Sequence, residues 1–382
     1  QETAEVSLGF NEADIMEICS LESLAAHDVY LNVRYVLRRA DGILPAGSEV
    51  AYDQICLNEA AAVPFADESG RPEYVKDGNM HSFFGEMAFE GSGTDRIASW
   101  KMTFDSESGA LVGWSLGGKE LVKSPLRPSF ARAGVENDLG AGQDKRMKMW
   151  RDAALEVDSF QVKENDGSYR VEVVFKPIGE AARVSMAYDV FADGTMAVTE
   201  SMADAGKLSE APIMQRFGME LAMPGEYSVL EFFGLGPFEN YSDRSSAALM
   251  GHYVQRVEDQ YHYGYVRPQE SGTKTGLKWM RVLDDNGSGI EITSDVKFSG
   301  SALPFHWTEM DVRVLDDNQA HSLELKKLAF EDERSLGNTW VNFDLVQMGL
   351  GCINSWGEWP LDGYLVKARP YEFRFVLRPV NN

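Results

Sequence analysis

Two glutamates lie in sequence contexts where a carboxylate could take part in chemistry. Glu239 is part of Gly-Pro-Phe-Glu-Asn-Tyr, and Glu270 is part of Arg-Pro-Gln-Glu-Ser-Gly. Cleavage of a glycosidic bond needs two carboxylates that face it, about 5 Å apart where configuration is retained. Because the chain has 60 acidic residues, the sequence alone does not identify such a pair. Each glutamate could instead cap a turn or form an ion pair with Arg244 or Arg267.

A lone tryptophan in a glycine-rich stretch offers a different kind of chemistry. Residues 349–357 are Gly-Leu-Gly-Cys-Ile-Asn-Ser-Trp-Gly, with three glycines around Trp356. This composition predicts a shaped loop that presents a flat apolar ring, and a sugar has an apolar face of matching size. Trp356, with Asn354 beside it, is therefore a candidate for sugar binding. The alternative is that the indole packs in the core.

Three further patterns are better explained by structure than by chemistry. Residues 113–117 match G-x-S-x-G, but Ser115 lies in an alternating segment with no helix after it, as that motif requires. The same stretch nearly forms a phosphate-binding loop, yet Glu120 occupies the Ser/Thr position. Residues 284–295 place oxygens near calcium-ligand positions, but strands rather than helices flank them. We predict a strand serine and a hairpin turn.

Composition excludes several classes of partner. The 382 residues carry a formal net charge of −24, which argues against nucleic acid and anionic membranes and suits a neutral ligand. Three cysteines, Cys19, Cys56 and Cys352, with no C-x-x-C, favour neither a disulfide framework nor a zinc site. No run of about 18 apolar residues predicts a membrane span. No signal peptide is visible, which leaves a cytoplasmic and a periplasmic location open.

Short alternating segments separated by turn residues predict an all-β fold. The expected strands are 29–38, 49–57, 99–104, 110–116, 169–175, 183–191, 195–202, 278–283, 289–293, 323–330 and 371–377. Residues 145–155 have helical composition with a possible cap at Asp144, and 237–244 could form a short helical turn. The polar stretch 64–79 has the composition of a linker.

Several motifs in a fixed order carry a resemblance to a known family. They are Arg132-Ala133 with Asn137-Asp138, Arg216-Phe217-Gly218, Gly234-Leu235-Gly236-Pro237 with Glu239-Asn240-Tyr241 and Asp243-Arg244, Glu270-Ser271-Gly272, and Met348-Gly349 and Gly351 with Ser355-Trp356. In this combination residues 28–382 resemble the C-terminal region of the β-galactosidases of glycoside hydrolase family 2. The resemblance implies a large galactose-mutarotase-like β-sandwich at 81–382, a linker at 61–80, and the last part of an immunoglobulin-like sandwich at 1–60.

The resemblance also implies where the chemistry lies. In this family the catalytic glutamates and the magnesium site belong to a (β/α)₈ barrel, which we do not find in this sequence. We therefore expect no catalytic residue, metal or cofactor in this chain, and a barrel-bearing domain or large subunit as partner. The ligand is expected to be galactose or a β-galactoside, and the assembly a homo-oligomer or hetero-oligomer. Trp356 matches a loop tryptophan at the rim of the family's active site.

The resemblance also implies a mobile loop near the active site. This loop matches residues 140 to about 149, and its candidate residues are Gly140, Gly142, Asp144 and Arg146. The chain departs from the best-known members at Gly134 and at 352–354.

An autonomous carbohydrate-binding module remains an alternative function. It would use the concave face of the sandwich, with Arg132, Asn137, Asp138, Arg216, Glu270 and His306 as candidate contacts. An independent mutarotase is less well supported, because no His/Glu acid–base pair stands out in the sequence.

Overall fold

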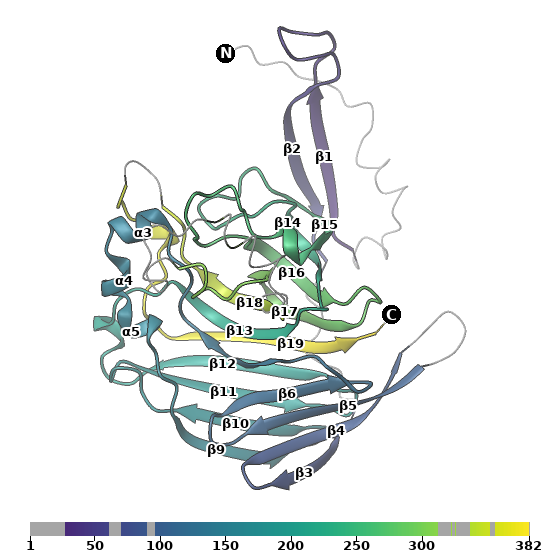
Figure 1. Ribbon diagram of the computed structural model, residues 1–382, viewed down its shortest axis with the longest axis vertical. Helices are drawn as coiled ribbons and strands as arrows, with labels where there is room; N and C mark the ends of the chain where they lie inside the picture. The colour runs from purple at the N-terminus through teal and green to yellow at the C-terminus, as the bar shows by residue number, and fades with distance from the viewer. Residues whose placement is uncertain are drawn as a thin grey trace. The chain divides into compact units, whose positions relative to one another are not determined.

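The chain divides into two compact units, residues 1–63 and residues 64–382 (Figure 1). The computed structural model describes residues 27–60, 70–89, 96–311, 322, 325, 337–351 and 356–381, without the side chains of Arg96 and Asp144.

The described part of the first unit is a single antiparallel hairpin. Strand β1 (Val29–Val36) pairs with β2 (Glu49–Asn58), with Val33 opposite Asp53. Several large apolar side chains of this hairpin are exposed: Tyr35, Val36, Ile43, Leu44, Val50, Tyr52, Ile55 and Leu57. Because two strands alone are marginal in water, we expect the hairpin to need further contacts for stability. Its assignment to an immunoglobulin-like sandwich stays a prediction.

The second unit is built almost entirely of strands. They are β3 (Glu73–Asp77), β4 (Met80–Phe89), β5 (Arg96–Asp105), β6 (Ala110–Leu116), β7 (Lys119–Glu120), β8 (Ser124–Ser129), β9 (Val157–Glu164), β10 (Tyr169–Phe175), β11 (Ala182–Val190), β12 (Met196–Asp204), β13 (Arg216–Pro224), β14 (Val229–Gly236), β15 (Leu249–Arg256), β16 (Lys274–Leu283), β17 (Gly289–Leu303), β18 (Asn338–Gln347) and β19 (Tyr371–Val380). The all-β class expected from the sequence is confirmed.

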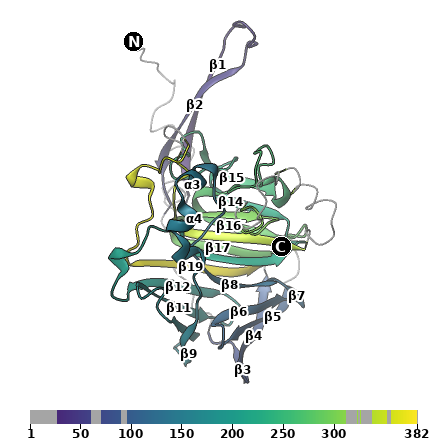
Figure 2. The same cartoon turned by 60° about the vertical axis from the view of Figure 1, so that its left-hand side comes forward.

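All the pairings between these strands are antiparallel, and they form a sheet that curls over itself. From β3 the order runs through β4, β5 and β6, which meets β8 at the pair Leu111–Leu126. It continues through β13, β18, β17, β19, β12, β11 and β10 to β9. Strands β16, β14 and β15 extend from β17. Figure 2 shows β3 to β6 beside the layer of β9, β11 and β12.

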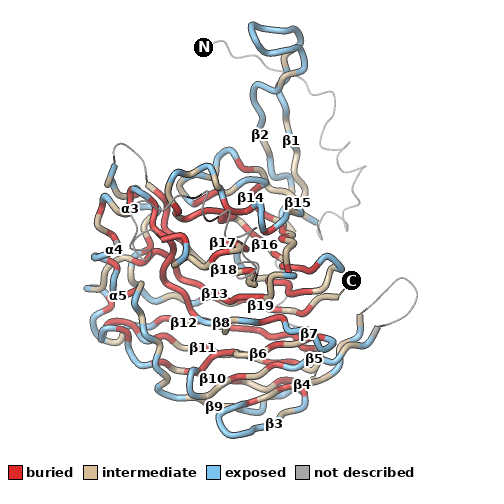
Figure 3. The backbone as a smooth tube through the Cα atoms, in the orientation of Figure 1, coloured by how far each residue is buried: buried red, intermediate tan, exposed pale blue. Residues whose placement is uncertain are grey.

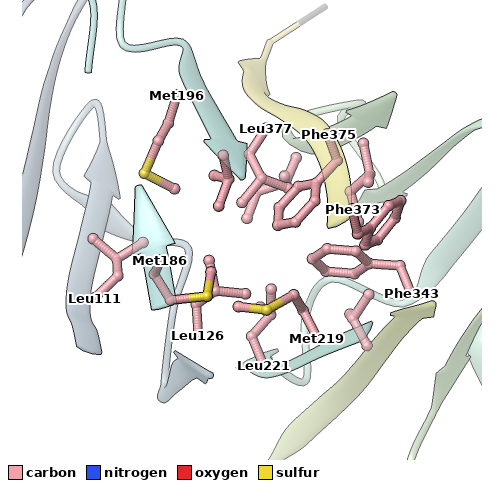
Figure 4. Close-up of a cluster of buried hydrophobic side chains, with 14 of the residues drawn as sticks. Leu111, Leu126, Met186, Met196, Met219, Leu221, Phe343, Phe373, Phe375 and Leu377 are labelled. Carbon is pink, nitrogen blue, oxygen red and sulfur yellow. The ribbon is translucent and has the colours of Figure 1, made fainter. Parts of the chain in front are cut away.

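The main core fills the space inside this curl. Figure 4 shows buried side chains from distant strands meeting there, among them Leu111 of β6, Met186 of β11, Met219 of β13 and Phe375 of β19. Outer strands alternate in burial, as β11 does, because one face meets the core and the other meets water (Figure 3). Strand β13 is different, since its first eight residues are all buried.

The burial of β13 matters because the strand carries two charged residues, Arg216 and Glu220. Charged groups removed from water need partners that replace their hydration. The surroundings of β13 are therefore where polar networks must form.

Two short helices, α4 (Gln143–Arg146) and α5 (Lys148–Arg151), stand where one helix was expected over 145–155, and α3 (Glu136–Gly140) precedes them. The expected helical character is present, but one continuous helix is not. The break falls at Met147, whose φ and ψ are −100° and 13°. Met147 and Trp150 are both buried, and turning these two side chains inward takes precedence over continuing one regular helix. Composition showed the helical tendency but not this inward turn.

The expected linker at 61–80 also needs correction. Residues 61–69 lie outside the described residues, but β3 lies inside the expected linker and belongs to the second unit. Its Tyr74 stacks on Phe83 with ring centroids 5.0 Å apart, which explains why the segment is ordered as a strand. The second unit thus begins before residue 81.

The structure also bears on the predictions for several short segments. The segment 237–244 contains a bridge between Tyr241 and Arg244 rather than a helical turn. Ser115 lies in β6, and Asp284 accepts hydrogen bonds from the backbone N–H groups of Asn286 and Ser288, as a hairpin turn requires. The strand expected at 323–330 falls outside the described residues, apart from Leu325, which is helical. No helix among the described residues is long and apolar enough to cross a membrane.

Candidate functional site

The start of the Trp356 loop is fixed by an aspartate from a distant segment. Asp243 accepts hydrogen bonds from the backbone N–H of Leu350 (3.0 Å, Oδ1) and of Gly351 (2.8 Å, Oδ2). A Cβ at Gly349 would lie 2.4 Å from Oδ2 of Asp243, so only glycine allows this close approach. The glycines of this loop therefore serve its attachment as well as its shape.

A fully buried ion pair lies beneath the same loop. Nη1 of Arg132 donates to Oδ2 of Asp138 at 2.7 Å and to the carbonyl of Ala133 at 2.9 Å, while Nη2 donates to the carbonyl of Gly349 at 3.3 Å. Asp138 also accepts from the backbone N–H of Val135 at 2.9 Å. Both charged side chains are 0% exposed. Burial opposes the charge of Arg132, but Asp138 and Glu270 outweigh it and raise its pKa.

The segments that carry Asn137-Asp138, Asn240-Tyr241 and Met348-Gly349 meet at this place. Val135, Tyr241 and Leu350, one from each segment, form a small buried apolar cluster. The Tyr241 hydroxyl lies 3.5 Å from Oε1 of Glu270. The sequence motifs that carry the family resemblance thus build one structural base for the loop at 349–357.

Both candidate glutamates have structural partners. Glu239 accepts from Nη2 of Arg244 at 2.6 Å and from the Tyr265 hydroxyl at 2.6 Å, as its structural alternative anticipated. Glu270 is 3% exposed and accepts from the Thr273 hydroxyl at 3.1 Å. Burial raises the pKa of Glu270, although Arg216 and Arg132 oppose that effect.

Trp356 itself lies on the surface, with 71% of the residue exposed. It is next to α3, because a Cβ at Gly140 would lie 3.0 Å from Cδ2 of the indole and 2.7 Å from Cα of Gly357. Gly357 has a φ of +89°, which side chains other than glycine rarely tolerate, and the chain there passes directly against Gly140. The exposed position expected for Trp356 is confirmed, whereas its role in binding stays a prediction.

The segment expected to be mobile begins at this contact. Gly140 ends α3, Gly142 precedes α4, and Arg146 ends α4 with its guanidinium 5.4 Å from the ring centroid of Trp359. Asp144 lies in α4, and its side chain is outside the described part of the structure. The neighbouring Gln143 is 1% exposed, so part of the segment is anchored. Its mobility stays a prediction.

The remaining candidates lie at different depths. Arg216 is 2% exposed and donates to Oδ1 of Asn342 at 2.6 Å, with Oε2 of Glu270 3.7 Å away. Asn137 is nearly buried, and a Cβ at Gly351 would lie 3.5 Å from its Nδ2. Asn354 lies outside the described residues. Arg132, Asp138, Arg216 and Glu270 therefore have partners within the protein. Their side chains expose almost no surface to a ligand.

His306 contacts a different set of residues. Its Nδ1 lies 2.7 Å from the Thr308 hydroxyl, and its ring centroid lies 4.3 Å from that of Trp340. Its Nε2 is 3.5 Å from Oε1 of Glu220 and makes no hydrogen bond within the described residues. Glu220 and its partner Arg127 were not expected from the sequence, since nothing local marks two strand residues that pair across β8 and β13.

The chain matches the protein family described as Beta galactosidase small chain over residues 96–377. A β-galactosidase of Halalkalibacterium halodurans is 32% identical over 287 residues, which cover 74% of this chain and 27% of that protein. One of Priestia megaterium is 30% identical over 341 residues, covering 88% and 30%. One of Vibrio cholerae is 26% identical over 381 residues, covering 95% and 33%.

This chain therefore belongs to the β-galactosidase small chain family, the small-subunit or C-terminal region of β-galactosidases. It spans about a third or less of the length of the curated relatives named above.

Solved structures give weaker comparisons. A galactose mutarotase related enzyme of Lactobacillus acidophilus has 6% identity and a TM-score of 0.38, covering 78% of this chain and 97% of its own. A GalM/aldose epimerase homologue of C. elegans has 8% identity and a TM-score of 0.32, covering 78% and 99%. The fold of this chain is defined by its own strand pairing.

Substitution of Gly140 by alanine tests the contact between α3 and the Trp356 loop. The added methyl would overlap Cα of Gly357 and crowd the indole, so the loop must shift. In a β-galactosidase that contains this region, we expect KM for a galactoside to rise about threefold to tenfold, with a melting temperature within a few degrees of wild type. The Gly363→Ala variant is the control, because Gly363, like Gly140, has no positive φ, but an added Cβ there would meet nothing within 4 Å. Equal KM values for wild type and Gly140→Ala would show that the contact does not position Trp356.

A buried carboxylate close to Arg216 should make stability depend on pH. Burial raises the pKa of Asp344 to about 7, although Arg216 opposes the shift. The folded state holds the proton more tightly than the unfolded state, so this contribution to stability is complete below about pH 4 and is lost as the pH rises to 7. Asp344→Asn should remove this pH dependence, which is on the order of 4 kcal/mol.

The measurement is the free energy of unfolding of wild type and Asp344→Asn by urea at several pH values from 4 to 8. Asp285→Asn is the control, since the side chain of Asp285 is 74% exposed. Parallel curves for wild type and Asp344→Asn would contradict the assignment.

Proposed function

We propose that this chain forms one wall of the sugar site of a β-galactosidase and that Trp356 supplies the contact surface. The ligand is galactose or the galactosyl part of a β-galactoside. The catalytic carboxylates come from a barrel domain outside these 382 residues, in the same polypeptide or in a large subunit. Membership of the small chain family supports a partnership with such a domain.

The observation that carries the proposal is the exposed ring of Trp356, which is the most exposed aromatic side chain among the described residues. A ligand or partner that covers this ring is the reason we propose for its position. The attachments at Gly349, Leu350 and Gly351 hold the start of the loop before any ligand arrives. A preorganised contact costs less conformational entropy on binding.

The most distinctive carboxylates of the chain do not support a catalytic role. Glu270 is buried and Glu239 is half-buried, and both are held by hydrogen bonds, whereas a nucleophile or acid/base must reach the glycosidic bond. The described residues contain no group of three His, Cys, Asp or Glu that could hold a metal ion, so we assign no magnesium site to them. A magnesium site on the barrel stays part of the proposal.

The isolated 382-residue chain is accordingly expected not to hydrolyse β-galactosides. The test is an assay with a chromogenic galactoside at high protein concentration, using chain purified from a host that lacks β-galactosidase. Mixing the chain with a barrel-bearing polypeptide that lacks this region should then restore turnover. Turnover by the chain alone would overturn the proposal, and so would a barrel-bearing polypeptide whose activity does not change on mixing.

The candidate contacts named for an autonomous carbohydrate-binding module do not support that alternative function. Four of its six candidate contacts, Arg132, Asp138, Arg216 and Glu270, are buried in ion pairs or hydrogen bonds. A ligand would have to break these interactions to reach the side chains.

A further inference from the structure

The second unit contains a cavity of about 430 Å³ at β8 and α5 that the proposed function does not use. Among the residues that line it are Arg127, Ser129, Arg151, Ala154, Glu220 and Trp307. None of them belongs to the loop that carries Trp356. The volume lies within the range of about 300–1,000 Å³ that is typical of small-molecule sites.

The charged group of this cavity is Glu220, which is 3% exposed. Its Oε1 accepts from Nε of Arg127 at 2.8 Å and lies 2.7 Å from Nη2 of the same guanidinium, and its Oε2 accepts from the Ser129 hydroxyl at 3.1 Å. Each carboxylate oxygen offers about two acceptor positions, and within the described residues Ser129 uses one of the two on Oε2. An acceptor position on Oε2 is therefore left for a hydroxyl group of a ligand.

Glu220 remains ionised over the whole neutral range. Burial alone would raise its pKa, but His306 and Arg127 outweigh burial and lower the pKa to about 2. An ionised carboxylate is a strong acceptor for a hydroxyl donor.

Both arginines that line the cavity have a carboxylate partner. Arg127 neutralises Glu220, and Nη2 of Arg151 lies 2.5 Å from Oδ2 of Asp311. The Arg151 and Asp311 side chains are 8% and 1% exposed. A charged ligand would find no uncompensated partner among these groups, so the cavity favours a neutral molecule that carries hydroxyl groups.

An aromatic ring completes the wall. Trp307 is half-buried, and the guanidinium of Arg151 lies 5.0 Å from its ring centroid, which holds the indole in place. A fixed indole offers apolar surface, while Glu220 and Arg127 offer an acceptor and donors at the same cavity. A sugar ring combines an apolar face with hydroxyl groups around its rim, and it matches both.

We propose that this cavity is a second saccharide site, in which Trp307 packs against the apolar face of a sugar unit and Oε2 of Glu220 accepts from one of its hydroxyls. The site is separate from that of Trp356 and does not depend on it. Its chemistry selects neutral saccharides and not charged ligands.

The experiment uses the full 382-residue chain and two neutral probes, methyl β-D-galactopyranoside and maltose, each titrated with ligand-observed NMR. Ala154→Trp is the blocking variant, because Ala154 is exposed at the cavity wall and a large side chain there would occupy the space. Trp307→Ala removes the aromatic surface. Phe238→Ala is the matched control, since it removes an exposed aromatic ring that does not line this cavity. Trp356→Ala is measured as well, because it reports binding at the other proposed site.

At least one probe should bind the wild-type chain. Ala154→Trp and Trp307→Ala should each raise the Kd of that probe at this cavity at least about tenfold, whereas Phe238→Ala should leave it within about twofold. Melting temperatures of all variants check that the fold is intact, and Ala154→Trp keeps the test valid if Trp307→Ala unfolds. Absence of binding for both probes would overturn this proposal, as would binding that Ala154→Trp leaves unchanged. Binding lost only in Trp356→Ala would also overturn it, while supporting the proposed function.

Discussion

Replacement of Asp138 by alanine is expected to lower the free energy of unfolding by about 3–5 kcal/mol, the usual range when one partner of a buried ion pair is removed. Arg132 would remain as a buried cation, since both side chains are 0% exposed. The backbone N–H of Val135 would lose its acceptor as well. Urea unfolding of the two proteins at neutral pH measures the effect.

A surface ion pair nearby provides the control. Lys148 and Asp152 lie 3.8 Å apart, with side chains 75% and 63% exposed, so Asp152→Ala should change stability by less than about 1 kcal/mol. A loss of only about 1 kcal/mol in Asp138→Ala would mean that water reaches Arg132 and that the base of the loop is not rigid.

Replacement of Trp356 by alanine should raise KM for a β-galactoside roughly fivefold to 150-fold in the enzyme that contains this region. This change corresponds to a loss of about 1–3 kcal/mol of binding free energy. The ring is exposed, so its removal costs the fold little, and the melting temperature should change by no more than a few degrees. An interaction made equally in the ground state and the transition state changes KM and leaves kcat nearly the same.

Phe238→Ala is the matched control, because Phe238 is a second exposed aromatic residue, 50% exposed. Its KM should equal that of the wild type. A Trp356→Ala enzyme with unchanged KM and a melting temperature many degrees lower would show that the indole supports folding rather than binding.

Local patterns predicted most of the strands. The expected strands at 110–116 and 169–175 coincide with β6 and β10, because alternation on a half-buried sheet is visible within a few residues. The prediction of one continuous helix at 145–155 was wrong, since the turn at Met147 depends on what its side chain contacts in the folded chain. The position of β3 was missed for a related reason, as the partner of Tyr74 comes from the next strand.

The site was predictable as a set of segments but not as a set of contacts. The motifs marked Arg132, Asp138 and Trp356 as belonging together, and the structure places Arg132 and Asp138 beneath Gly349, at the start of the loop that leads to Trp356. The sequence did not show that Arg132 and Asp138 are buried, because burial depends on residues more than a hundred positions away, such as Gly349. The pair Arg127–Glu220 carries no local signal and became visible only when β8 and β13 were placed side by side.

The central claim is that Trp356 touches the sugar, and a crystal structure of the β-galactosidase containing this region with galactose bound tests it most directly. We predict that the indole of Trp356 lies within about 4 Å of the bound sugar, which is the distance of van der Waals contact. Trp356 should also keep its place beside Gly140. A galactose bound at the catalytic carboxylates with the indole of Trp356 more than about 8 Å away, well beyond contact distance, would contradict the account.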